Sequence, residues 1–206
     1  NGSDADAIAL LHGEAEGEVK IKHNNRAYVA QGVEFMLDWD FELGSVSHDF
    51  EIGVRIHTDE EDRFQAEDTY WQSVNGGLAL TELGVFGNKS SNNRLTEADA
   101  TALYVRDEIE FGDWTFSPGI RYENVEVRRR EWSAPERVDA NISKNKANKQ
   151  SEIIPGLGVT YQVNDNLILL GGVHKGFAPA GYKPETDNEE SLSYEFGGRA
   201  FIGDFL

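Results

Sequence analysis

Three consecutive arginines at positions 128–130 form the densest cluster of cationic side chains in the sequence. A guanidinium group donates two parallel hydrogen bonds to a carboxylate or phosphate, so Arg128, Arg129 and Arg130 could bind an anionic ligand. The same arginines could instead anchor anionic lipid headgroups, or simply be solvated at the surface. The sequence therefore makes these three residues candidates for ligand binding and leaves the other two interpretations open.

The remaining chemically capable residues form no catalytic or metal-binding pattern. The acidic run at 59–62 follows His57, but it lacks the ligand spacing and glycine of a calcium loop, which favours a solvated acidic tip. None of the five histidines falls at a paired metal-ligand spacing, and the absence of cysteine removes thiolate sites and cysteine nucleophiles. Residues 84–90 lack the glycine that a phosphate loop needs before Lys89, and no serine lies in a nucleophile elbow. These residues therefore give no starting point for a catalytic triad, a phosphate loop or a zinc site, and we expect no catalytic residue, no resident metal and no cofactor.

Composition excludes further classes of protein. The 37 acidic and 19 basic residues give a net charge of −18, which repels the phosphates of nucleic acid. The longest apolar runs, at 7–11 and 167–170, are far shorter than the roughly 20 residues that a membrane-spanning helix requires. The 21 glycines and the 11% aromatic content favour β structure. The elements that position any site are therefore expected to be strands.

Strict alternation of apolar and charged residues is the strongest structural signal, and residues 33–43 show it best. Apolar side chains occupy every odd position of this segment, whereas acids occupy most even positions, with Met36 as the exception. Successive side chains of a strand point to opposite faces, so one face is apolar and the other charged. Eleven residues also match the about 9 to 11 that a tilted strand needs to cross a membrane.

The same alternation recurs along the chain, and the connections sort by length. It appears at 50–57, 114–123, 153–163 and 192–199. Two further strands, at 98–111 and 167–175, carry apolar residues on both faces, so their facing is not assigned. Short connections at 44–47, 112–113, 164–166 and 203–204 alternate with long polar ones at 58–97, 127–150 and 176–190. Residues 1–25 would be the end of another outer loop.

This combination is typical of outer-membrane barrels, which have short periplasmic turns and long extracellular loops. Lipid satisfies no backbone group, so strands that turn their apolar face outward to lipid and their polar face inward must belong to a closed barrel. Seven strands supply only an arc of such a barrel, and alone they should form an open, curved, antiparallel sheet. A soluble β sandwich could also alternate, although its connections need not sort by length. The residues expected to face the lumen are Glu34, Asp38, Asp40, Arg55, Arg121, Glu123, Glu195 and Arg199.

Four runs of residues carry a resemblance to a known family. The runs at 24–34, 114–123, 172–179 and 190–199 resemble TonB-dependent outer-membrane receptors, with the nearest likeness to the ferric dicitrate receptor branch. The similarity spans about 24–206, and its spacing holds across four strands. Ala180 departs from the pattern, because a second proline is common after such a Gly-Phe-x-Pro run.

The resemblance implies an all-β transmembrane barrel that transports and does not catalyse. Residues 1–206 would be part of a monomeric barrel of roughly 22 strands, with the plug domain and the other strands outside this chain. A ferric chelate would bind at the outer mouth, and TonB would act through the plug to release it across the bacterial outer membrane. Membrane lipid and lipopolysaccharide would surround the barrel. Import of a glycan or cobalamin, or a soluble β-rich binding or adhesion domain, remain alternatives.

Overall fold

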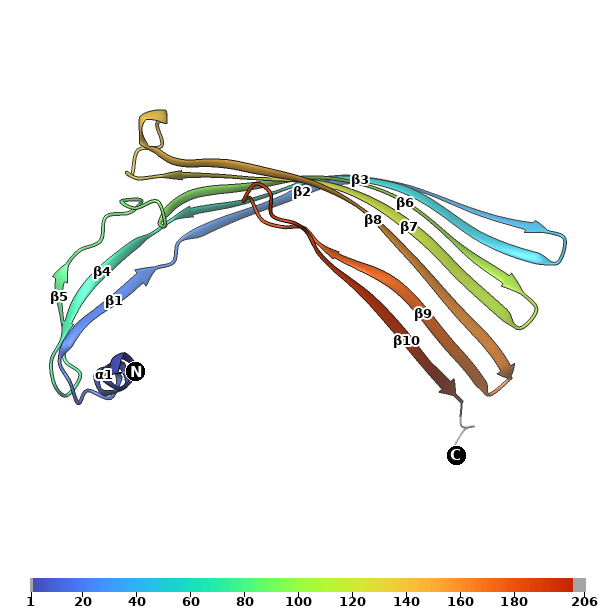
Figure 1. Cartoon of the computed structure of the whole chain (residues 1–206), viewed down its shortest axis with the longest axis horizontal. Helices are drawn as coiled ribbons and strands as arrows, with labels where there is room; N and C mark the ends of the chain where they lie inside the picture. The colour runs from blue at the N-terminus through green and yellow to red at the C-terminus, as the bar shows by residue number, and fades with distance from the viewer. Residues whose placement is uncertain (1, 202–206) are drawn as a thin grey trace. The chain divides into compact units, whose positions relative to one another are not determined.

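The computed structural model describes residues 2–201, and these residues are almost entirely β-strand (Figure 1). The predicted turn at 203–204 lies outside them. Among the described residues, no helix has the length and apolar character needed to cross a membrane. In chain order the elements are α1 (Gly2–Leu11), β1 (Gly17–His23), β2 (Arg26–Leu43), β3 (Val46–Phe64), β4 (Ala66–Gln72), β5 (Leu78–Glu82), β6 (Asn93–Phe111), β7 (Trp114–Trp132), the 3-10 turn η1 (Asp139–Asn141), β8 (Ile142–Asn164), β9 (Leu167–Ala178) and β10 (Glu189–Ala200).

Seven of the strands form one open antiparallel sheet, in the order β10-β9-β8-β7-β6-β3-β2. All seven predicted strands are present, so the predicted fold class is confirmed. The strands are longer than the sequence pattern indicated, because β3, β7 and β8 continue into segments that had been read as polar connections. The turns before β3 and β7 each place a glycine, Gly44 and Gly112, at positive φ, where glycine carries no steric penalty.

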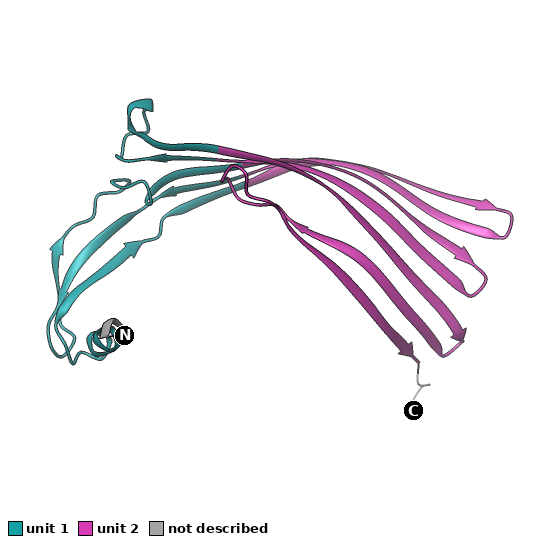
Figure 2. Cartoon of the chain, in the orientation of Figure 1, with its two compact units in different colours: residues 1–29, 60–97, 129–146 teal, residues 30–59, 98–128, 147–206 magenta. Residues whose placement is uncertain are grey.

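The chain divides into two compact units (Figure 2). Unit 1 contains residues 1–29, 60–97 and 129–146, and unit 2 contains residues 30–59, 98–128 and 147–206.

Unit 1 holds regular structure where the sequence pattern indicated only polar connections. Strands β1, β4 and β5 form a three-stranded sheet, in which Val19 pairs with Tyr70 and Tyr70 with Leu80. The amide of Gln72 donates a hydrogen bond to the carbonyl of Leu10, which ties α1 to this sheet. Residues 1–25 therefore contribute a helix and a strand. These elements were not predicted because each is short and is stabilised by distant partners.

Unit 2 contains the three short hairpin turns, which gather at one end of it (Figure 2). Its strands leave their apolar side chains uncovered: Phe35 is 70% exposed and Trp39 is 69% exposed. Phe41 stacks on His48 with ring centroids 4.6 Å apart, and neither ring lies in a buried core. An exposed apolar face of this extent is unusual for a soluble protein and is the expected surface of a strand that meets lipid.

We call the opposite face of unit 2, which carries Glu51 and Arg106, the charged face. Contacts on it determine the facing of the two strands that the sequence left unassigned. On β6, Arg106 donates to Glu51 over 2.7 Å, which places the even positions of β6 on the charged face. On β9, Gly172 pairs with Gly158, where a Cβ would lie 3.5 Å from that of Ser117. Ser117 occupies the same alternate positions of β7 as Arg121, whose guanidinium lies over the Tyr104 ring, so the even positions of β9 lie on the charged face as well.

Candidate anion-binding site

Three arginines from three strands converge on a single carboxylate in unit 1. Glu61 of β3 accepts hydrogen bonds from Arg63 at 2.9 Å and from Arg94 at 3.4 Å, and it forms an ion pair with Arg26 at 3.2 Å. Three guanidinium groups around one carboxylate leave two positive charges in excess. We call Arg26, Arg63, Arg94 and Arg129 the arginine cluster.

Arg129 and Lys144 extend the positive charge along β7 and β8. The Nε of Arg129 donates to the hydroxyl of Thr96 over 3.1 Å, and its Nη1 lies 3.9 Å from Glu131. Lys144 reaches the other oxygen of Glu131 at 2.9 Å. Together with the three arginines at Glu61, five basic side chains face two acidic ones, an excess of three positive charges in a chain whose overall charge is strongly negative.

The electrostatics of the arginine cluster show that its cations are close and partly desolvated. Burial, together with the positive charges of Arg129 and Arg63, lowers the pKa of Arg94 from its ordinary value. For Glu61, burial acts to raise the pKa, but the hydrogen bond and charge of Arg63, with the charges of Arg94 and Arg26, outweigh it and lower the pKa. Both residues lie outside the predicted membrane-crossing segments at 50–57 and 98–111. An additional anion at this place would therefore relieve repulsion among the arginines.

Two donors in the arginine cluster have no protein acceptor. The Nε–H groups of Arg63 and Arg94 are buried and make no hydrogen bond among the described residues. The two side chains are only 12% and 16% exposed. Leaving a buried charged donor unsatisfied is costly, so a shift of either side chain that brings its Nε–H to an oxygen acceptor would be favourable. The arginine cluster therefore has both the charge and the free donors to bind a carboxylate or a similar oxygen anion.

The acidic run at 59–62 is not the solvated tip that the sequence favoured. It lies inside β3, and alternation sends Glu61 and Asp62 to opposite sides of that strand. Glu61 enters the arginine cluster, and Asp62 pairs with Arg137. The prediction was wrong because, apart from Arg63, the cations that pair with Glu61 and Asp62 come from segments distant in sequence. Among the described residues, no group of three or more histidine, aspartate or glutamate side chains is placed to hold a metal ion.

The three arginines at 128–130 do not act together in the structure. Arg128 pairs with Asp99 and, at 3.0 Å, with Glu126, both in unit 2. Arg130 pairs with Glu97 at 3.1 Å in unit 1. Because alternate residues of β7 point to opposite sides, only Arg129 of the three joins the arginine cluster. Arg26, Arg63 and Arg94 were not singled out from the sequence, since none of them adjoins another arginine in the chain.

Several of the residues expected to face the lumen share the charged face of unit 2. The hydroxyl of Tyr104 lies 3.4 Å from Glu34, and the guanidinium of Arg121 lies 5.5 Å from the centre of the Tyr104 ring. Arg121 also donates to Glu123 over 2.5 Å. Glu195 joins the same face through its register with Gly172. Whether this face lines a lumen stays a prediction.

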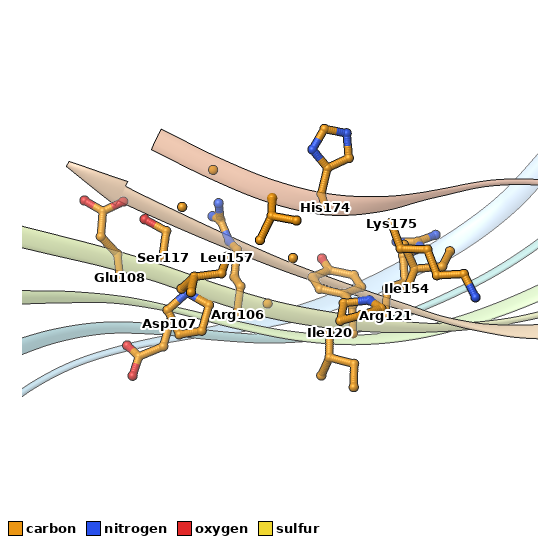
Figure 3. A pocket seen from close by; sticks show the side chains of 18 of the residues that line it. Arg106, Asp107, Glu108, Ser117, Ile120, Arg121, Ile154, Leu157, His174 and Lys175 are labelled. Carbon is orange, nitrogen blue, oxygen red and sulfur yellow. The ribbon is translucent and has the colours of Figure 1, made fainter. Parts of the chain in front are cut away.

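A shallow hollow of about 570 Å³ lies on the sheet in unit 2 (Figure 3). Ser117, Glu108 and His174 point to one side of the sheet there, whereas Asp107 and Ile120 point to the other (Figure 3). Three basic and four acidic residues are among those that line it, so the hollow carries no positive excess. It is a poorer site for an anion than the arginine cluster.

A sheet of long antiparallel strands with one exposed apolar face, short turns and an arginine-rich site defines the class of outer-membrane transport barrels. The sequence model described as "TonB dependent receptor-like, beta-barrel" matches residues 11–206, and the chain belongs to this family. Its members are outer-membrane proteins of Gram-negative bacteria and are transporters, not enzymes. The family match also excludes the soluble β-rich domain that the sequence had left open.

Similar proteins include metal-chelate and iron receptors. The metal-pseudopaline receptor CntO from two strains of Pseudomonas aeruginosa is 26% identical over 170 and 169 residues, which cover 77% of this chain and 23% of the receptor. The chain thus spans about a quarter of the length of these curated relatives. Unliganded ferric citrate transporter FecA superposes with a TM-score of 0.65 at 19% identity, over 89% of this chain and 26% of FecA. The siderophore receptor PiuA from Acinetobacter baumannii gives 0.59 at 14% identity, over 89% and 31%.

Proposed function

We propose that the protein is a TonB-dependent receptor that takes up an anionic ferric chelate, such as ferric citrate or a carboxylate siderophore, across the outer membrane. The observation that carries this proposal is the arginine cluster, in which Arg63 and Arg94 retain buried donors without acceptors. Oxygen atoms of the chelate would accept from these donors, and its negative charge would offset the cationic excess. Binding of this kind breaks and forms no covalent bond.

The position of the arginine cluster supports binding at the outer mouth. Glu61 and Arg63 occupy the same alternate positions of β3 as Arg55, which was expected to face the lumen, and they lie beyond the predicted crossing segment at 50–57. The chelate would therefore contact residues outside the predicted crossing segments. In this proposal the remaining residues of the lumen set, Asp38, Asp40 and Arg199 among them, solvate the charged face of unit 2.

The rest of the transport machinery lies outside this chain in the same proposal. Residues 1–206 form part of a larger monomeric barrel domain, and a plug domain passes the action of TonB to the bound chelate. Arg128 and Arg130, both already paired with acids, contribute little to chelate binding. They would contact lipopolysaccharide at the rim.

Ferric citrate binding to the purified full-length receptor tests the proposal. Replacing Arg94 by alanine removes one cation and one free donor, so we expect the Kd for ferric citrate to rise about tenfold or more, given that hydrogen bonds to charged groups are worth roughly 1.5–3 kcal/mol. The matched control is Arg130→Ala, which removes the same charge from a residue outside the arginine cluster and should change Kd less than about twofold. Equal losses in the two variants would contradict the assignment.

A second candidate is uptake of a chelate of another metal, and the similarity to the metal-pseudopaline receptor CntO favours it. The arginine cluster recognises the anionic chelator more directly than the metal it carries, so its geometry is compatible with both. The same titration with zinc citrate in place of ferric citrate distinguishes them. Tighter binding of the zinc chelate, together with normal growth of a deletion strain on ferric citrate, would favour the second candidate.

A further inference from the structure

Arg137 makes an unusually complete set of interactions for a residue in a connection between strands. It lies in the segment between β7 and β8, and four of its five N–H donors are used. Nη1 and Nη2 donate to the two carboxylate oxygens of Asp62 at 2.9 and 2.5 Å. Nε donates to Asn93 at 2.7 Å, and Nη2 also donates to the carbonyl of Arg63 at 3.3 Å.

Aromatic rings on β7 and β3 lie close to the same guanidinium. Its Cζ lies 5.0 Å from the centre of the Trp132 ring and 5.6 Å from that of Phe64. A planar guanidinium can stack on rings while it donates in its own plane, which a lysine ammonium does not reproduce. Arg137 therefore holds three consecutive residues of β3 at once: the side chains of Asp62 and Phe64 and the carbonyl of Arg63 between them.

The segment that carries Arg137 is itself held in place. Asn93, which is fully buried, donates to the carbonyl of Ala134 at 2.7 Å, so the acceptor of Arg137 also fixes the start of the segment. The amide of Ser133 donates to the carbonyl of Asn141 at 2.9 Å, which closes the connection at its base. A support fixed at both ends can hold the end of β3 in one conformation.

Alternation along β3 connects this support to the arginine cluster. Asp62 and Phe64 point to one side of the strand, and Glu61 and Arg63 point to the other, where Arg63 meets Glu61 at 2.9 Å. Arg137 therefore contacts the strand from the side opposite to the proposed ligand. When residues 62–64 are held from the side of β3 opposite to the ligand, the direction in which the Arg63 side chain leaves the backbone is fixed.

We propose that Arg137 is a positioning residue, which orients Arg63 for anion binding by holding residues 62–64 from the opposite side of β3. The inference rests on the proposed function, because it assumes that the arginine cluster binds the chelate. Arg137 itself does not contact the ligand. Its removal should weaken binding although every charge of the arginine cluster remains.

The binding test uses the purified full-length receptor with ferric citrate as the probe. Arg137→Ala should raise Kd by about the same factor as Arg63→Ala, and the double variant should be no worse than either single variant, because both changes remove the same oriented group. Arg137→Lys keeps the charge but loses the two parallel hydrogen bonds to Asp62, so this variant should bind ferric citrate as weakly as Arg137→Ala. If the two single effects multiply in the double variant, or if Arg137→Lys binds normally, the proposal is wrong.

Arg130→Ala is the matched control for these variants. Arg130 carries the same charge and also lies over the Trp132 ring, at 5.8 Å, but it pairs with Glu97 and does not contact residues 62–64. We expect its Kd to stay within about twofold of the unmodified receptor. A loss equal to that of Arg137→Ala would mean that charge alone explains the effect, which would overturn the positioning role.

A measurement without ligand separates this inference from the proposed function. The amides of Phe64 and Gln65 donate to the carbonyls of Asn25 and Asn92, so their hydrogen exchange reports how firmly the end of β3 is held. Exchange at both amides should be faster in Arg137→Ala and Arg137→Lys than in Arg130→Ala. Unchanged exchange would overturn the support role. Failure of the unmodified receptor to bind ferric citrate, with exchange altered as expected, would instead reject the ligand and leave the support intact.

Discussion

Leu37 and Asp38 are adjacent in β2, but alternation gives their side chains opposite surroundings. Leu37 is 73% exposed on the apolar face, whereas Asp38 belongs to the charged face with Glu51. If the apolar face meets lipid, Leu37→Arg should destabilise the full-length barrel by about 2–4 kcal/mol, while Asp38→Asn should leave it nearly unchanged. Denaturant unfolding in phospholipid vesicles measures both. Equal effects at the two positions would show that the register assigned to β2 is wrong.

Glu61 predicts a specific loss of stability in acid. Its surroundings lower its pKa below the ordinary value of 4.5, because the arginine charges outweigh the effect of burial. A carboxylate whose pKa is depressed by folding adds stability above its unfolded pKa, and that contribution is lost as the pH falls through the folded value. Unfolding of the full-length receptor should therefore show a pH-dependent component below about pH 4.5.

The control for this pH dependence is Glu61→Gln, which keeps the size of the side chain and removes its titration. That component should be absent from the Glu61→Gln variant. At neutral pH the same variant should be less stable, because the arginines lose the only carboxylate that three of them share. A pH profile identical to that of the unmodified receptor would contradict the role assigned to Glu61.

At the scale of elements, the sequence predicted what depends on local alternation and missed what depends on distant pairing. Residues 33–43 revealed β2 because every second side chain is apolar, a pattern that needs no partner to be read. The bond from Arg94 to Glu61 joins residues 33 positions apart, and no local pattern indicates it. The sequence likewise left the facing of β6 unassigned, and the hydrogen bond from Arg106 to Glu51 determines it. The small sheet of unit 1 was missed for the same reason.

Packing between neighbouring strands leads to a prediction at Gly53 of β3. A Cβ at this position would overlap the ring of Tyr104 on β6, so glycine is required for the ring to lie flat against the strand. Gly53→Ala should displace Tyr104 from Glu34 and Arg121 and cost about 1–3 kcal/mol through overpacking. The control is Gly156→Ala, whose Cβ would lie 3.4 Å from the nearest atom, on His174, and should be tolerated. Thermal unfolding of the full-length receptor compares them, and equal midpoints would refute the packing argument.

At the scale of the whole molecule, charged and apolar side chains are separated along the strands. In β2 the acids Glu34, Asp38, Asp40 and Glu42 alternate with apolar positions that carry exposed aromatic residues such as Phe35 and Trp39. Within this acidic chain the arginine cluster is a local exception, because five basic side chains there face two acidic ones. A barrel strand needs this division, since lipid requires an apolar face and a wet interior requires a polar one.

The two edge strands of the seven-stranded sheet provide the last prediction. β2 and β10 are each paired on one side only in this structure, and an unpaired backbone group in hydrocarbon costs several kcal/mol. If residues 1–206 are an arc of a closed barrel, both edges pair with further strands in the full-length receptor. Hydrogen exchange at residues 33–43 and 192–199 should then be as slow as in β7, while β5, at the edge of the small sheet in unit 1, exchanges faster. Rapid exchange along β2 or β10 in the membrane-embedded receptor would show that the sheet stays open and that the barrel proposal is wrong.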